Sequence, residues 1–234
     1  MSKVAIFVEG QTEQIFFERL IEEIAGKKNL NTRLLKFSGR VSKRVVHQIL
    51  ETSIPSPIKK HECFIYDSSQ DESVVSDIKE QYNSLVLAGF DAIIGIRDLF
   101  PRWTFEELSK VREFIGVHIK VSTIKPLFVL GVMECEAWFI AEYKHFSKVH
   151  PSLTLENIIQ ILGKDPSTED MQMLQTPAKE IDKIYQTIGL SYNKNKDIVQ
   201  NIVDKLDYTE IYLNFPKKFP DILNLIKLLD SLFI

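Results

Sequence analysis

Short runs of strand-forming apolar residues recur through the first half of the chain. They cover residues 4–8, 33–37, 63–66, 92–96 and, less cleanly, 128–133. Between these runs apolar side chains return at helical spacing, as at Phe16, Leu20 and Ile24 and again within residues 78–86. Because strands that alternate with helices pair in parallel through right-handed crossovers, this half predicts a parallel-sheet, three-layer α/β sandwich.

Local signals predict where helices begin and end. Thr12 fits the N-cap of the first helix, Glu13 complements the helix dipole in its first turn, and Gly26 suits its end. The segment "VSKRVVHQIL", residues 41–50, predicts a second helix.

Strand signals fade after about Tyr143. Four later segments predict helices separated by Gly, Pro and Asn breaks, at residues 153–163, 177–189, 196–206 and 220–234. We therefore expect an α/β domain over residues 1–143 and a helical C-terminal extension packed on it over residues 144–234.

The composition is that of an ordinary globular protein. The 234 residues are 44% apolar and 26% charged. Cys63 and Cys135 lie in apolar runs without CxxC or Cys/His spacing, so we expect buried thiols in a reducing cytoplasm rather than a zinc site. No signal peptide is recognisable, and no apolar run reaches the ~20 residues that span a membrane, so we expect a cytoplasmic protein.

Basic residues are concentrated in one segment, although the net charge is −3. Between Lys27 and Lys60 the only acid is Glu51. This segment is a candidate nucleic-acid-binding surface, and we select from it Lys36, Arg40, Lys43 and Arg44. The alternative is a solvated helix face whose compensating acids lie elsewhere in space.

Acidic residues end four of the predicted strands. They are Glu9, Asp67 and Asp98, followed by Glu134 and Glu136 after the last run. In a parallel sheet the carboxyl ends of all strands lie at one edge, where ligands bind in open α/β sheets. Clustered carboxylates repel one another unless their pKa rises or a cation binds. Carboxylate oxygens suit Mg²⁺ or Mn²⁺, which favours phosphodiester cleavage or phosphoryl transfer.

Several of these residues also have a structural interpretation. Asp67 begins the serine-rich stretch "DSSQDES", where a turn or helix cap is the better interpretation, whereas Glu9 has no such local task. Arg97 would contact a phosphate or form a salt bridge with a nearby acid. Lys194 would touch a nucleic-acid backbone or cap a helix end.

Three motifs resemble those of a known family. The segments "FVEGQTE", "GIRDLFP" and "MECEAWFIAE" are similar to the VEGxTE, RDxD and ExEAW motifs of an uncharacterised bacterial family of TOPRIM-like proteins. The first also resembles the start of the TOPRIM domain of overcoming-lysogenization-defect nucleases. Because the tail from residue 176 onward is similar to the family's helical C-terminal region, the resemblance covers most of the chain.

The resemblance implies a TOPRIM-like sheet with an acidic edge that binds Mg²⁺ or Mn²⁺, and nuclease-type or nucleotidyl-transfer chemistry. Matched residue by residue, it implies catalytic roles for Glu9, Asp98 and Glu136. The metal ligands that it implies are Glu9, Glu13, Asp98, Glu134 and Glu136.

One position departs from the motif. The second acid of RDxD falls on Phe100, and its loss would weaken a second metal site.

Two functional hypotheses follow. The first is a Mg²⁺-dependent enzyme acting on nucleic-acid phosphodiesters, in defence against phage or plasmids. The second is a catalytically degenerate TOPRIM-like module that binds a protein or nucleic-acid partner.

Overall fold

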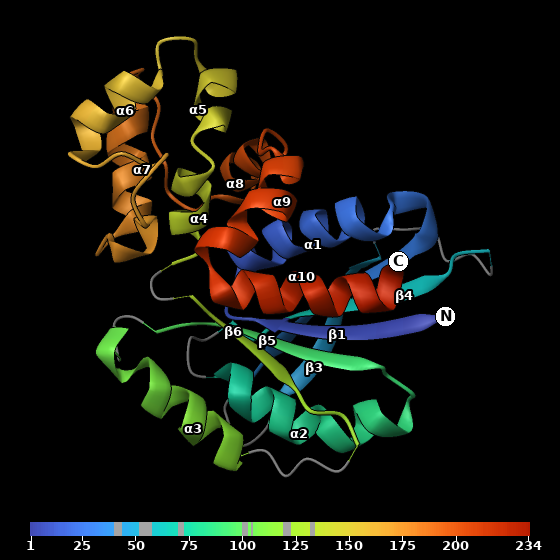
Figure 1. Ribbon diagram of the computed structural model, residues 1–234. Coiled ribbons are helices and arrows are strands. Elements are labelled where there is room, and N and C mark those ends of the chain that lie inside the picture. The colour runs from blue at the N-terminus through green and yellow to red at the C-terminus, as the bar shows by residue number, and fades with distance from the viewer. Residues whose placement is uncertain are drawn as a thin grey trace.

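A six-stranded sheet forms the centre of the molecule (Figure 1). The structure is a computed structural model and describes residues 1–39, 44–51, 58–69, 73–99, 103, 105–118, 123–131 and 134–234. The strand order is β3-β2-β4-β1-β5-β6, and every neighbouring pair is parallel except β2 and β3. The strands are β1 (Ser2–Val8), β2 (Leu30–Ser38), β3 (Val45–Glu51), β4 (His61–Asp67), β5 (Ala92–Asp98) and β6 (Leu127–Gly131).

Helices cover both faces of the sheet, which makes the fold a three-layer α/β sandwich as expected. Two lie on one face: α2 (Ser73–Leu87) and α3 (Leu108–His118). The other face carries α1 (Gln11–Ala25), α8 (Lys196–Val203), α9 (Tyr208–Lys218) and α10 (Pro220–Phe233). A smaller lobe is formed by α4 (Glu136–Ala141), α5 (Lys144–Val149), α6 (Leu155–Leu162) and α7 (Pro177–Gln186).

The central strand β1 is buried on both sides, which explains its unbroken apolar run. Val4 and Ile6 belong to the hydrophobic cluster under α1 and α10, whereas Ala5 and Phe7 belong to the cluster under α2. A strand that is buried on both faces cannot show polar alternation.

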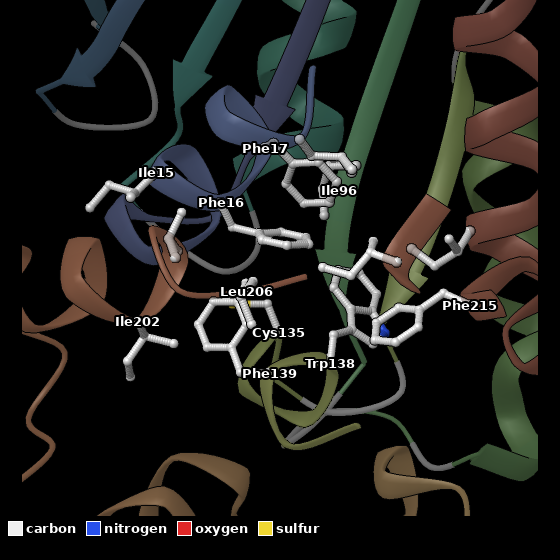
Figure 2. Close-up of a cluster of buried hydrophobic side chains, with 14 of the residues drawn as sticks. Ile15, Phe16, Phe17, Ile96, Cys135, Trp138, Phe139, Ile202, Leu206 and Phe215 are labelled. Atoms are coloured by element: carbon white, nitrogen blue, oxygen red, sulfur yellow. The ribbon is translucent and has the colours of Figure 1, made fainter. Parts of the chain in front are cut away.

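The larger cluster joins the two halves of the sequence (Figure 2). Figure 2 shows Phe16 and Phe17 of α1 beside Trp138 and Phe139 of α4. The rings of Phe16 and Phe139 are 5.4 Å apart, and those of Phe17 and Trp138 are 6.0 Å apart. The same cluster also contains Ile202, Leu206 and Phe215, so the core is continuous across the expected boundary near residue 143. That division of the chain stays a prediction.

Most predicted elements are found in the structure, with two corrections. The expected helix over residues 41–50 is wrong, because β3 runs antiparallel to β2 there; residues 41–43 lie outside the described part. Thr12 is not the N-cap of α1, since the helix begins after Gly10. Glu13 does lie in the first turn, and Gly26 is the C-cap residue. All four helices predicted after residue 143 are present, whereas α5 and α9 were not predicted.

No helix within the described ranges is long and apolar enough to cross a membrane. Both cysteines are buried free thiols, as expected.

Candidate carboxylate site

Glu9 and Asp98 lie at the carboxyl ends of neighbouring parallel strands. Glu9 directly follows β1, and Asp98 is the last residue of β5. The two strands pair in register with Phe7 opposite Gly95, so Glu9 lies level with Arg97 and one residue before Asp98. Glu9 is buried and Asp98 is half-buried. The strand pattern therefore brings these two acids to one edge of the sheet.

Two further carboxylates reach this edge from helices. Glu13 lies in the first turn of α1, and Glu136 lies in the first turn of α4. Glu13 is 7% exposed and Glu136 is 0% exposed. An acid in the first turn of a helix is stabilised by the amide end of the helix dipole, which offsets part of the cost of burying it.

The pKa values indicate that these four carboxylates interact. Burial and the neighbouring Glu136 raise the pKa of Glu13 from 4.5 to about 7. Burial, followed by the charges of Glu13, Glu9 and Glu136, raises the pKa of Asp98 well above its usual range. Because burial and like charges disfavour ionisation, Glu13 and Asp98 keep protons that isolated carboxyl groups would release.

Lys194 comes to this cluster from the connection between α7 and α8. Its Nζ atom lies 2.8 Å from Oε1 of Glu134 and 3.3 Å from Oε1 of Glu136. Burial alone would lower the pKa of Lys194, but the charges of Glu136 and Glu134 raise it overall. The ammonium group is therefore charged and lies against two of the sequence-predicted metal ligands.

Other groups already bind Glu134 and Glu136. The hydroxyl of Tyr192 donates a hydrogen bond of 2.7 Å to Oε1 of Glu136. The backbone N–H of Ala178, at the start of α7, donates to Oε2 of Glu134 at 3.1 Å. Burial and the charge of Glu136 raise the pKa of Tyr192, which keeps its hydroxyl protonated as a donor.

Cys135 lies between these two acids in the sequence and is 1% exposed. Its Sγ lies 3.7 Å from Oε2 of Glu136. Burial and the charges of Glu13, Glu136 and Asp98 raise the pKa of the Cys135 thiol. A thiol that remains protonated is a poor nucleophile, so thiolate chemistry has no support here.

Arg97 takes the salt-bridge role that was one of its two sequence interpretations. Its Nε lies 3.9 Å from Oε1 of Glu9, and the residue is 7% exposed. Asp67 acts as a turn residue, as expected: its Oδ1 accepts a hydrogen bond of 2.7 Å from the backbone N–H of Ser69. Asp67 also pairs with Lys36, whose Nζ lies 3.2 Å from Oδ2.

The structure changes the interpretation of the basic segment. The Arg44 side chain is 2% exposed, and its guanidinium binds Asp77 through Nε–Oδ1 and Nη2–Oδ2 distances of 2.8 and 2.9 Å. Such a bidentate, buried pair ties the residue that precedes β3 to α2 and leaves no guanidinium face for a phosphate. Lys36 remains half-exposed, whereas Arg40, Lys43 and the motif position Phe100 lie outside the described residues.

Sequence reasoning missed Tyr192 and did not foresee where Lys194 would lie. Tyr192 stands in the polar stretch "SYNKNKD", and no periodic pattern there marks a buried side chain. Its burial depends on how the α7–α8 connection folds across α4, which local sequence does not encode.

The donor chemistry of the cluster fits a hard divalent cation, because carboxylate oxygens are the preferred ligands of Mg²⁺ and Mn²⁺. The arrangement is different: among the residues that the structure describes, no group of three or more His, Cys, Asp or Glu side chains is placed to hold a metal ion. At Glu134 and Glu136 the adjacent cation is instead the ammonium group of Lys194.

Comparison of the chain with protein-family models, with curated proteins and with solved structures gives no significant match. The site itself and the motif resemblance are therefore the two indications of function.

Proposed function

We propose that the protein is a TOPRIM-like enzyme that uses a divalent cation, Mg²⁺ or Mn²⁺, to process nucleic-acid phosphodiesters. The observation that carries the proposal is the placement of four acids at the carboxyl edge of the sheet: Glu9 and Asp98 at the ends of β1 and β5, and Glu13 and Glu136 in the first turns of α1 and α4. Burial and the neighbouring acids raise the pKa of Asp98. Strongly raised carboxyl pKa values at a ligand-binding edge are typical of functional sites. A role in defence against phage or plasmids follows only from the motif resemblance.

The four acids divide into two pairs with different proposed tasks. Glu9 and Asp98 would hold the cation, because they end the two adjacent central strands. Glu13 and Glu136 would complete the oxygen shell from their helices. The bound cation would supply Lewis-acid polarisation of a phosphate oxygen and activation of water. Lys36, half-exposed at the same edge, would contact the nucleic-acid backbone.

Plasmid nicking by wild type and Glu9→Gln, with and without Mg²⁺ or Mn²⁺, tests the proposal. The substitution keeps the size of the side chain and removes its charge. We expect wild type to nick plasmid with the metal and to stop in EDTA. We expect Glu9→Gln to lose about a hundredfold or more, as is typical when one group acting at the reacting centre is removed.

The matched control is Glu62→Gln, because Glu62 lies near the amino end of β4 and pairs with Lys3, away from the acidic edge. This variant should nick like wild type. Metal binding is measured separately by thermal unfolding, since a cation at about 100 times its Kd stabilises by about 2.7 kcal/mol. If metal does not change the stability and nicking survives Glu9→Gln, the proposed metal-dependent enzyme is excluded.

A second candidate is a degenerate TOPRIM-like module that binds a protein or nucleic-acid partner. It is favoured by the ammonium group of Lys194, which lies 3.3 Å from Glu136. The absence of the second RDxD acid, replaced by Phe100, also favours it. For this candidate, wild type would bind DNA or RNA in a gel-shift assay without cleaving either in Mg²⁺ or Mn²⁺.

A further inference from the structure

Lys194 has an unusual backbone conformation for its residue type. Its φ is 56°, in the left-handed region that side chains with a Cβ rarely adopt. The backbone of a non-glycine residue is strained there, so surrounding contacts must maintain the conformation.

Several contacts fix the segment around Lys194. The backbone N–H of Tyr192 donates to Oδ1 of Asp182 on α7 at 2.8 Å. On the other side, Asn195 is the N-cap of α8, with its side chain accepting from the backbone N–H of Asp197. The segment is thus tied to a helix at each end, and these ties direct the strained residue toward the acids.

The charge contacts of Lys194 differ from an ordinary surface ion pair. The side chain is 42% exposed, but its partner Glu136 is 0% exposed. An exposed pair contributes little to stability, whereas a buried carboxylate that loses its cation keeps an uncompensated desolvation cost. The contact therefore matters most for Glu136.

We propose that Lys194 is a tethered counter-ion of the carboxylate cluster, whose ammonium group takes the position at Glu134 and Glu136 that a divalent cation would otherwise share. Oε1 of Glu136 already accepts from Tyr192 and lies 3.3 Å from the ammonium group. A divalent cation that used Glu136 would meet the repulsion of this fixed positive charge. The lysine and the divalent cation therefore compete for the same acids. The competition rests on the proposed function, whereas the counter-ion role in the absence of metal does not.

The test compares Lys194→Met with the control Lys196→Met. Both variants remove one ammonium group from the same polar stretch, and Lys196 is exposed at the start of α8. In EDTA, we expect Lys194→Met to unfold at a lower temperature than wild type and Lys196→Met to unfold like wild type. Lys194→Arg, which keeps the charge, should recover most of the loss.

The competition is measured by titrating each folded variant with Mn²⁺ alone, using calorimetry. We expect Lys194→Met to bind Mn²⁺ at least about tenfold more tightly than wild type, which corresponds to about 1.4 kcal/mol. Hydrogen exchange of residues 191–195 provides a second measurement on wild type. Exchange there should speed up when Mn²⁺ displaces the ammonium group.

The outcomes separate this inference from the proposed function. If Lys194→Met and Lys196→Met are equally stable in EDTA, the counter-ion role is wrong. If wild type and Lys194→Met bind Mn²⁺ equally, competition is wrong while the metal-dependent function stands. If neither binds Mn²⁺ but Lys194→Met is destabilised in EDTA, the counter-ion role stands and the metal-dependent function fails. Should Lys194→Met not fold at all, folding of Lys194→Arg supports the counter-ion role and its failure to fold overturns it.

Discussion

Replacing Glu13 by Gln should stabilise the protein near neutral pH. Burial and the charge of Glu136 raise the pKa of Glu13 from 4.5 to about 7, so its ionised form is disfavoured in the folded state. Since one pKa unit corresponds to about 1.4 kcal/mol, the ionised carboxylate costs about 3 kcal/mol of stability. Gln has the same shape and carries no charge at any pH, so the substitution removes this cost.

The effect has a defined pH window. Between about pH 4.5 and about pH 7 the folded protein keeps a proton on Glu13 that the unfolded chain has released. The folded state then binds more protons than the unfolded state, so the free energy of unfolding falls as pH rises through this window. Below the window Glu13 is neutral in both states and Glu13→Gln should match wild type; above it the variant should be more stable by the full amount.

Urea unfolding in EDTA across this window measures the difference. At about pH 8 the expected gain of about 3 kcal/mol corresponds to a rise of about 6 to 12 °C in unfolding temperature. The control is Glu23→Gln on the same helix, which breaks an exposed pair with Arg19 and should change stability by less than about 1 kcal/mol at every pH. A Glu13→Gln variant that tracks the control across the whole window would refute the reasoning.

Three packing predictions can be measured by the same unfolding assay. Arg44→Ala should cost about 3 to 5 kcal/mol, because it leaves the carboxylate of Asp77 buried without its cation. Phe139→Ala should also cost about 3 to 5 kcal/mol, since the ring is 0% exposed between α1 and α4. Asp221→Ala should cost about 1 to 3 kcal/mol, because the backbone N–H of Leu130 on the edge strand β6 loses its 2.8 Å acceptor.

The three packing predictions share one control variant. Leu213 is 54% exposed, so Leu213→Ala should change stability by no more than about 0.5 kcal/mol. If Arg44→Ala or Asp221→Ala proved as mild as Leu213→Ala, the corresponding contact would not hold its elements together.

The acids at the strand ends were predictable because a parallel sheet has one carboxyl edge. The strands of Glu9 and Asp98 are buried on both faces, so each appears in the sequence as an apolar run with a clear end. The last apolar run had already marked Glu136, and the motif resemblance added Glu13; both lie in the first turn of a helix at that edge.

The helix expected over residues 41–50 was wrong for a physical reason. Where β3 pairs with β2, Leu34 lies opposite Leu50 and Leu35 opposite Gln48, so one residue is bulged out of the ladder. A bulge breaks the two-residue alternation of a strand and leaves apolar spacings that resemble a helix face. The β-branched residues Val45 and Val46 were the better signal, because branching at Cβ favours strands.

The position of Lys194 could not be predicted from local sequence, and it changes how the two halves of the chain are understood. The lysine and Glu134 are 60 residues apart, and their contact exists only when the α7–α8 connection folds across the start of α4. Since that connection also supplies Tyr192 to Glu136, the C-terminal half provides both the positive charge and a hydrogen-bond donor to acids that the sheet edge gathers. The helices after residue 143 therefore belong to the site as well as to the core. A fragment ending there would keep Glu9, Glu13 and Asp98 but lose the lysine that lowers the cost of their shared charge.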